Sequence, residues 1–453
     1  MPITDLNRRQ FLKGSGTTAI AGAMGAGITL SAMPTPAMAK EVPYLVNGRY
    51  DFDTVYSRVG TDCTKWDRQI QLFGPIQVGM GIADLDFRAA PCIGEAMRER
   101  LEHENWGYLN WSIGFTDLKE GISNWNRERH GVEVDPDTIE IASGVHRGLI
   151  AAIRTFSPPA SKLLMMTPTY NGFYSDLTRS QTVANESRMI FENGRYHVDW
   201  DDLEARMTPD THCMLLCNPQ NPTGNVWSRE DLTRIGELAL KHDVVVLADE
   251  IHADFVREGH YTPFASLDPE IVHNSLTFKA ITKTFSMPAS KNAYWFSTNP
   301  IYLERVKVNH RADINTLGVV ANTAAYQKGQ DWLDQLLVYI DGNHTFVENY
   351  LKENLPEVTY TKAEGTFLAW LHFGEIMDEV GVVEKAAATR KAGSPKTETQ
   401  VFEAWLAETC GVQLNEGMDY GLGGERCMRM NIGTSRQLID LALNNIRDAV
   451  RSV

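Results

Sequence analysis

Four short apolar segments in the middle of the chain most constrain its fold. They are four or five residues long and cover 162–166, 213–217, 244–248 and 276–279. Apolar runs without polar alternation are typical of strands buried on both faces of a parallel sheet. Amphipathic stretches such as 229–241 separate the segments and predict βαβ units. We therefore expect an α/β fold, with a mostly parallel sheet flanked by helices.

A distinctive polar loop follows each of these segments. In chain order, the loops contain Tyr170, Asn218-Pro-Gln-Asn-Pro-Thr-Gly224, Asp249-Glu-Ile-His252 and Lys283. Asp249 lies 25 residues after Gly224, and Lys283 follows after another 34 residues. Ligands of open α/β sheets bind where parallel strands end, so these side chains are expected at one site. Each element alone is a weak signal, but the ordered combination is specific.

The combination fits the chemistry of pyridoxal 5'-phosphate (PLP). This cofactor requires a lysine whose amine can be neutral, which a desolvated pocket favours, and Lys283 is the candidate. A carboxylate such as Asp249 keeps the pyridine nitrogen protonated, so that the ring can accept electrons. An aromatic face over the ring excludes water, and Tyr170 is the candidate.

Two further groups complete the expected site. The phosphate is best bound by backbone N–H groups at the start of a helix, and Ser143-Gly-Val-His-Arg-Gly148 precedes the helical run Leu149–Phe156. The substrate carboxylate requires a bidentate arginine, for which Arg429 is the candidate.

The sequence resembles the fold-type I PLP enzymes of aminotransferase class I/II, and specifically the MalY/PatB-type carbon–sulfur (cystathionine β-) lyases. The resemblance runs from about Tyr50 to the C-terminus. Its motifs are Arg58-Val-Gly-Thr-Asp62, Lys65-Trp-Asp67, Ala83-Asp-Leu-Asp-Phe87, Trp106-Gly-Tyr108, Asp249-Glu-Ile-His252 and Lys283-Thr-Phe285. It implies a large PLP-binding domain, a smaller α/β domain, and a homodimer with shared active sites.

The resemblance implies roles for residues around the cofactor ring. Lys283 would hold the cofactor covalently, Asp249 would pair with the pyridine nitrogen, and Asn221 would bond the ring hydroxyl. His252 stands three residues after Asp249, where this lyase branch has His. Tyr170 would stack on the ring and contact the substrate, whose α-carboxylate Arg429 would bind.

At the phosphate, the resemblance implies backbone contacts from Gly144, Val145 and His146. Tyr108 would reach the phosphate of the neighbouring subunit. Lys291 stands where aminotransferases place a phosphate-binding arginine. The usual phosphate-binding Ser is replaced by Ala280, which is a departure from the family pattern.

The chain is expected to have four segments. These are an export signal (1–39), an N-terminal segment that contributes to the small domain (40–82), the large PLP-binding domain (83–327) and the C-terminal small domain (328–453). Within the small domain the pattern predicts a helix from about residue 331, a strand over 365–371 and a helix over 436–451. The polar stretch Val383–Thr399 is expected to be an exposed insertion.

The first 39 residues have the order of a secretory signal. Arg8 and Arg9 precede a Gly/Ala-rich stretch, and Ala37-Met-Ala39 offers a cleavage site. The paired arginines indicate the twin-arginine (Tat) route and a soluble periplasmic protein. No later segment reaches the roughly 18 apolar residues of a membrane span. The formal charge of −15 argues against nucleic acid as a partner.

The six cysteines form no CxxC pair and no metal-ligand spacing, so neither a metal site nor a disulfide framework is expected. The expected reaction is β-elimination from cystathionine-like or S-substituted L-cysteine substrates, which yields pyruvate, ammonia and a thiol. An aminotransferase acting on an amino acid or an exported metabolite would use the same lysine, aspartate and arginine, so it stays open as an alternative. A binding protein on a degenerate enzyme scaffold is a third hypothesis, against which the intact residue set argues.

Overall fold

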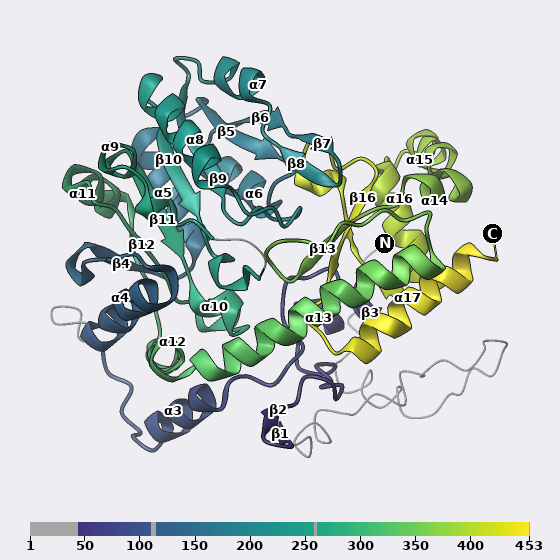
Figure 1. Cartoon of the computed structure of the whole chain (residues 1–453), viewed down its shortest axis with the longest axis horizontal. Coiled ribbons are helices and arrows are strands. Elements are labelled where there is room, and N and C mark those ends of the chain that lie inside the picture. Colours follow the sequence, from purple (N-terminus) through teal and green to yellow (C-terminus); the bar gives the residue numbers. More distant parts are fainter. Residues whose placement is uncertain (1–43, 110–114, 258–260, 453) are drawn as a thin grey trace. The chain divides into compact units, whose positions relative to one another are not determined.

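A seven-stranded sheet with the order β4-β12-β11-β10-β9-β5-β6 forms the framework of the chain (Figure 1). The neighbouring pairs from β11 to β6 are parallel, whereas β12 runs antiparallel to both of its neighbours. The strands are β4 Ile139–Ala142, β5 Lys162–Thr167, β6 Val183–Arg188, β9 Thr211–Cys217, β10 Val245–Asp249, β11 Ser275–Lys279 and β12 Ala293–Phe296. The computed structural model describes residues 44–109, 115–257 and 261–452, all within the unit Pro34–Val453.

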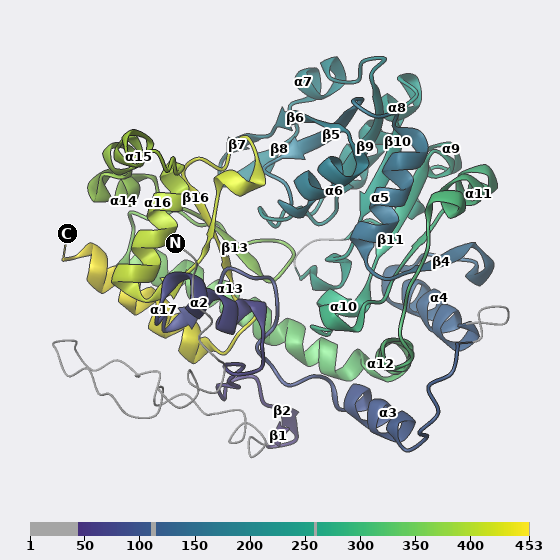
Figure 2. The ribbon, with the colours of Figure 1, turned by 180° about the vertical axis from the view of Figure 1, so that it is seen from behind.

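Both faces of the sheet are covered by helices, which explains the unbroken apolar runs. On β9, Met214 packs in the same core cluster as Leu232 of α8, whereas its neighbour Leu215 packs with Leu149 of α5. Figure 1 shows α8 on one face, and the view from behind in Figure 2 shows α5 and α6 on the other. The helices of this part are α2 Gln69–Phe73, α3 Pro91–Leu101, α4 Thr116–His130, α5 Val145–Phe156, α6 Gly172–Ser180, α7 Trp200–Ala205, α8 Arg229–Lys241, α9 Pro269–His273, α10 Ile281–Thr284, α11 Pro300–Asn309 and α12 Thr316–Lys328.

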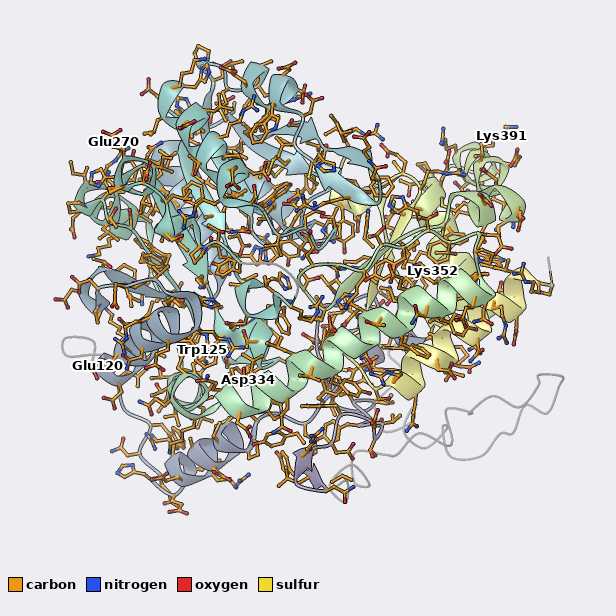
Figure 3. All side chains as sticks on the ribbon, viewed as in Figure 1. Glu120, Trp125, Glu270, Asp334, Lys352 and Lys391 are labelled. Carbon is orange, nitrogen blue, oxygen red and sulfur yellow. The ribbon has the colours of Figure 1, made fainter. Side chains whose placement is uncertain are left out.

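The C-terminal third folds around a three-stranded sheet with the order β13-β16-β15. Its long helix α13 contacts α12 at one side and α17 at the other, and carries Asp334 and Lys352 toward its two ends (Figure 3). Strand β3 (Val78–Gly79), from the N-terminal segment, pairs with β14 here. The elements are α13 Gln330–Asn354, β13 Leu368–His372, α14 Gly374–Val380, α15 Val382–Lys391, α16 Glu398–Trp405, β14 Val412–Gln413, β15 Asn415–Glu416, β16 Cys427–Asn431 and α17 Arg436–Val450. Two small hairpins, β1 Leu45–Val46 with β2 Arg49–Tyr50 and β7 Ile190–Glu192 with β8 Arg195–His197, complete the strands.

Three expected boundaries differ from the structure. Helix α5 begins at Val145 rather than Leu149, because Gly144 takes a positive φ of 152° and lets the chain turn directly into the helix. Strand β13 begins at Leu368 rather than at residue 365, since Thr366 has a φ of 67° that a strand does not allow. The predicted insertion is mostly exposed but contains helix α15, which buries two small apolar side chains and has Lys391 at its outer end (Figure 3).

All six cysteines lie within the described residues and are free in the structure. The cysteines at both ends of the run 213–217 are buried on β9, as the apolar sequence predicted. None of the helices in the described part of the chain combines the length and apolar character needed to span a bilayer.

Candidate active site

The loops that follow β9, β10 and β11 bring the predicted residues together. Asp249 is the last residue of β10, and its carbonyl accepts a hydrogen bond of 2.9 Å from the N–H of Asn218, the first residue after β9. Lys283 is the third residue of the one-turn helix α10, which follows β11 after the single residue Ala280. The parallel register therefore places the Asn218–Gly224 loop, Asp249 and Lys283 at one edge of the sheet, as the sequence predicted.

Lys283 is held in a desolvated position. Its Nζ donates a hydrogen bond of 2.8 Å to the carbonyl oxygen of Ala83. Burial lowers the pKa of the Lys283 amine, and the charge of Arg429 adds to this effect, while Asp84 and Asp249 oppose it. A lowered pKa increases the neutral fraction of the amine, which is the form that can act as a nucleophile or accept a proton.

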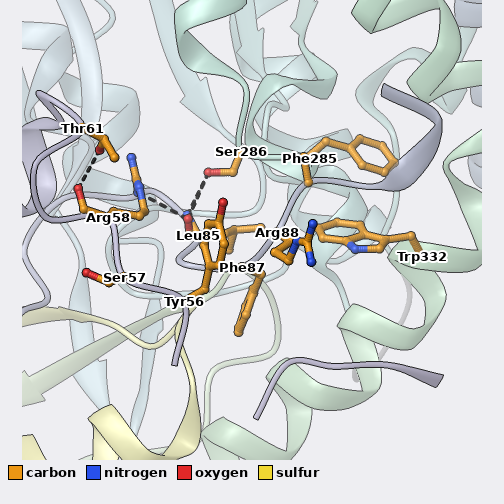
Figure 4. A pocket seen from close by; sticks show the side chains of 11 residues that line it. Tyr56, Ser57, Arg58, Thr61, Leu85, Phe87, Arg88, Phe285, Ser286 and Trp332 are labelled. Atoms are coloured by element: carbon orange, nitrogen blue, oxygen red, sulfur yellow. Dashed lines mark hydrogen bonds between the residues drawn. The ribbon is translucent and has the colours of Figure 1, made fainter. Parts of the chain in front are cut away.

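The segment that receives Lys283 is fixed by a network of ion pairs. Arg58 contacts Asp84 at 3.2 Å, and the fully buried Lys65 contacts Asp86 at 2.6 Å. The N–H of Leu85 donates to Ser286 Oγ at 3.0 Å, which ties this segment to the turn after Lys283. Figure 4 shows this contact beside a cavity of about 220 Å³. These residues belong to the motifs of the family resemblance, but their ion pairs could not be predicted, because a pair more than 20 positions apart leaves no periodic signal in the sequence.

Arg429 lies buried on β16 and points at the loop that follows β9. Its Nη1 donates to Asn221 Oδ1 at 3.1 Å, and its Nη2 donates to the carbonyl oxygen of Gly81 at 2.7 Å. The guanidinium carbon lies 5.0 Å from the centre of the Tyr420 ring, a cation–π distance. Its Nε is buried and has no hydrogen-bond partner. Two predicted site residues that lie 208 positions apart in the sequence are thus in direct contact.

Asp249 and His252 are both buried. Asp249 Oδ1 accepts one bond, from the backbone N–H of Ile251, and burial raises the pKa of its carboxyl to about 7. Burial lowers the pKa of His252 well below its ordinary value, and the charges of Lys283 and Arg429 add to this. Its Nδ1 has no hydrogen-bond partner. Asp249 is therefore a carboxylate whose ionised form needs a cationic neighbour.

Tyr170 lies three residues beyond β5, and its hydroxyl is 3.2 Å from His146 Nε2. His146 Nδ1 is in turn 2.6 Å from Oδ2 of Asp176, which is fully buried on α6. The sequence predicted only a backbone contact for His146, and it missed Asp176 because no motif surrounds that residue.

The predicted phosphate end is less fully assembled within this one chain. Gly144, Val145 and His146 form the start of α5, where backbone N–H groups have no partner within the helix. Lys291 is exposed. Tyr108 is also fully exposed, and in the described parts of the chain neither residue forms a hydrogen bond with the other predicted site residues.

These features fit the phosphate and the ring nitrogen of PLP, and an anionic group bound beside the cofactor. A side chain added at Gly144 would meet no atom within 4 Å, so open space lies beside the first turn of α5, as a bound phosphate requires. Asp249 offers a buried carboxylate to a protonated ring nitrogen, which would favour its ionised form. Arg429 keeps an unpartnered buried N–H for an anionic group.

Comparison with known proteins agrees with this geometry. The sequence model for aminotransferase class I and II matches residues 75–446. The chain belongs to this family. A second model, for the twin-arginine translocation pathway signal sequence, matches residues 5–25, which lie outside the described residues.

Several relatives match nearly the whole length of the chain. The chain is 34% identical to cystathionine beta-lyase PatB of Bacillus subtilis over 409 residues, which cover 88% of this chain and 100% of the relative. It is 29% identical to protein MalY of Escherichia coli, with 89% of this chain and 100% of MalY covered. The crystal structure of cystalysin from Treponema denticola, which contains a pyridoxal 5'-phosphate cofactor, superposes with a TM-score of 0.81 at 25% identity and covers 89% of this chain and 99% of its own. The fold class and the family predicted from the sequence are therefore confirmed.

Proposed function

We propose that this protein is a PLP-dependent carbon–sulfur β-lyase that acts on cystathionine-like or S-substituted L-cysteine substrates. The observation that carries the reaction type is the full-length similarity to PatB, a cystathionine beta-lyase. The site supports it with a desolvated lysine, a buried carboxylate and a buried arginine at one edge of the sheet.

Each proposed role follows from a contact or a charge. When bound, PLP accepts the electron pair that remains on the substrate α-carbon after its proton is removed. Lys283 removes this proton, since burial favours its neutral amine. Asp249 would hold a positive charge on the ring nitrogen, and Asn221 would bond the ring hydroxyl. Arg429 binds the substrate carboxylate. The electron pair of the α-carbon then forms a Cα=Cβ double bond as the Cβ–S bond breaks. The sulfur leaves with the electron pair of the broken bond and takes up a proton, and hydrolysis of the unsaturated amine that remains yields pyruvate and ammonia.

The test is pyruvate release from L-cystathionine and other S-substituted cysteines by the mature protein, with no keto-acid acceptor present. Sustained turnover supports a lyase. A single spectral change of bound PLP without pyruvate contradicts the lyase proposal and supports an aminotransferase, which the name of the matching family also allows.

Lys283→Ala is expected to abolish turnover, while Lys241→Ala, at an exposed lysine paired with Glu204, is the matched control. Activity that survives Lys283→Ala would contradict the proposed role of Lys283.

Location and assembly are part of the proposal. The signal-sequence match supports export by the Tat route, and we place the mature protein in the periplasm. Replacement of Arg8 and Arg9 by Lys is expected to retain a reporter fused to residues 1–39 in the cytoplasm, and continued export would contradict this.

The exposed Tyr108 supports a homodimer in which this side chain reaches the partner's phosphate. We keep the domain limits 40–82, 83–327 and 328–453, which the pairing of β3 with β14 supports for the first segment.

A further inference from the structure

His146, Asp176 and Tyr170 form a hydrogen-bonded chain beside the proposed cofactor site. His146 lies on the first turn of α5, Asp176 on α6, and Tyr170 in the loop between β5 and α6. The two bonds measure 2.6 Å from His146 Nδ1 to Asp176 Oδ2, and 3.2 Å from His146 Nε2 to the Tyr170 hydroxyl. Asp176 has no exposed surface, whereas the imidazole is 43% exposed. Three elements therefore converge on one aromatic side chain.

Packing also fixes the positions of the His146 and Tyr170 rings, in addition to the hydrogen bonds. The centres of the His146 and Tyr170 rings lie 5.5 Å apart, with an interplanar angle of 36°. Gly172, at the start of α6, lies against both: a Cβ there would be 2.5 Å from Tyr170 Cε1 and 2.7 Å from His146 Cε1. Such distances exclude any larger residue without displacement of a ring. The backbone of α6 thus acts as a wall behind the pair.

The buried carboxylate determines the orientation of the imidazole. Asp176 accepts the hydrogen of Nδ1, so Nε2 faces Tyr170 in either charge state of the ring. In a neutral His146, Nε2 accepts the hydrogen of the Tyr170 hydroxyl. In a protonated His146, Nε2 donates to that oxygen, and the hydroxyl hydrogen turns away from His146.

The surrounding charges favour the protonated form. Burial alone lowers the pKa of His146, but the hydrogen bond and the charge of Asp176 outweigh it, so the pKa lies above its ordinary value. Asp249 at the end of β10 acts in the same direction, and Lys283 on α10 opposes it. The titratable groups that act on His146 thus come from α6, β10 and α10, and the Tyr170 hydroxyl is in hydrogen-bond contact with it.

We propose that His146 and Asp176 are positioning residues for Tyr170, which hold its ring over the cofactor and turn its hydroxyl hydrogen toward the substrate. This inference rests on the proposed function, since it assigns Tyr170 a place beside PLP and the substrate. Tyr170 then offers a hydrogen-bond donor to an oxygen or sulfur atom of the substrate. The donor is lost when His146 loses its proton, because the hydroxyl then turns back to Nε2.

Two measurements on His146→Gln, Tyr170→Phe and the double variant test this. Glutamine can reach Tyr170 but does not titrate, and phenylalanine keeps the ring without the hydroxyl. The control is His242→Gln, at a surface histidine 3.0 Å from Glu204. First, NMR titration of the cofactor-free protein gives the pKa of His146, which is expected above 6.5 in the wild type and lower in Asp176→Asn. Second, the pH profile of kcat/KM is expected to fall as pH rises through that same pKa, in the wild type and the control only.

We expect His146→Gln to lower kcat/KM about fivefold to tenfold, the effect of one misdirected hydrogen bond. The double variant is expected to lose no more than Tyr170→Phe alone, because His146 acts through Tyr170. The proposal would be overturned if the pH profile of kcat/KM in His146→Gln matched that of the wild type. It would also be overturned if the losses in kcat/KM of the two single variants multiplied in the double variant.

Gly172→Ala provides a second route if Asp176→Asn does not fold. Its Cβ displaces both rings and removes no functional group, so a lower kcat/KM with an altered circular dichroism of bound PLP is expected. An unchanged spectrum would contradict the packing argument.

The NMR titration needs neither cofactor nor substrate, so it separates this inference from the proposed function. If no pyruvate forms, the pH profile is measured on the single-turnover reaction with an amino acid instead.

Discussion

For Arg429, the planar guanidinium with its several N–H donors matters as much as the positive charge. It donates to Asn221 and to the Gly81 carbonyl and retains an unpartnered Nε–H. Arg429→Lys keeps the charge but loses bidentate binding, so KM for the amino-acid substrate should rise about 10- to 100-fold. Steady-state kinetics of the purified variant check this. Arg426→Lys, at a half-exposed arginine paired with Asp378, serves as the control and should leave KM unchanged.

Asp249 makes the stability of the cofactor-free protein depend on pH. Burial raises the pKa of its carboxyl to about 7, above the roughly 3.9 of an unfolded chain. The folded state therefore holds this proton more tightly than the unfolded state. The contribution of Asp249 to the free energy of unfolding is full below about pH 4 and is lost as pH rises through 7. Between pH 5 and 8 the expected loss is about 3 kcal/mol. Urea unfolding should show a smaller loss for Asp249→Asn, and Asp313→Asn, at an exposed carboxylate, should behave as the wild type.

At the scale of single elements, the start of α5 carries the phosphate proposal. Gly144→Ala would place a methyl group in the open space beside the first turn and strain a φ of 152°. We expect PLP to bind at least about tenfold more weakly, as measured by fluorescence titration. Gly131→Ala at the end of α4 is the control, because it also has a positive φ and open space but lies at a helix C-terminus. Equal PLP affinity in both variants would remove α5 as the phosphate site.

The elements also show which sequence signals are reliable. Arg229–Lys241 is helical to the residue, and the four apolar runs are strands within one residue of most predicted ends, because both depend on local pattern. The start of β13 was missed because Thr366 takes a left-handed conformation that its residue type does not indicate. Helix boundaries at α5 depended in the same way on the backbone of a single glycine.

At the scale of the whole molecule, shared active sites predict complementation between two inactive variants. Lys283→Ala lacks the proposed base, and Tyr108→Ala lacks the side chain proposed to reach the partner's phosphate. A mixed dimer of the two would contain one site with both residues intact, so unfolding and refolding them together should restore up to about a quarter of wild-type activity. Each variant refolded alone is the control. No gain on mixing, with a dimer seen by light scattering, would show that the sites are not shared.

The sequence by itself determined the sheet, the family, and the residues that the strand ends would present, since apolar periodicity and ordered motifs are local properties of the chain. Only the tertiary structure decided which of these residues touch. The contact of Arg429 with Asn221 joins positions 208 residues apart. The ion pairs behind Lys283 and the buried Asp176 behind His146 likewise depend on how separate elements pack. Burial, which lowers the pKa of Lys283 and raises that of Asp249, exists only once the chain has folded, so the chemistry of the site could be named from the sequence but its electrostatics could not.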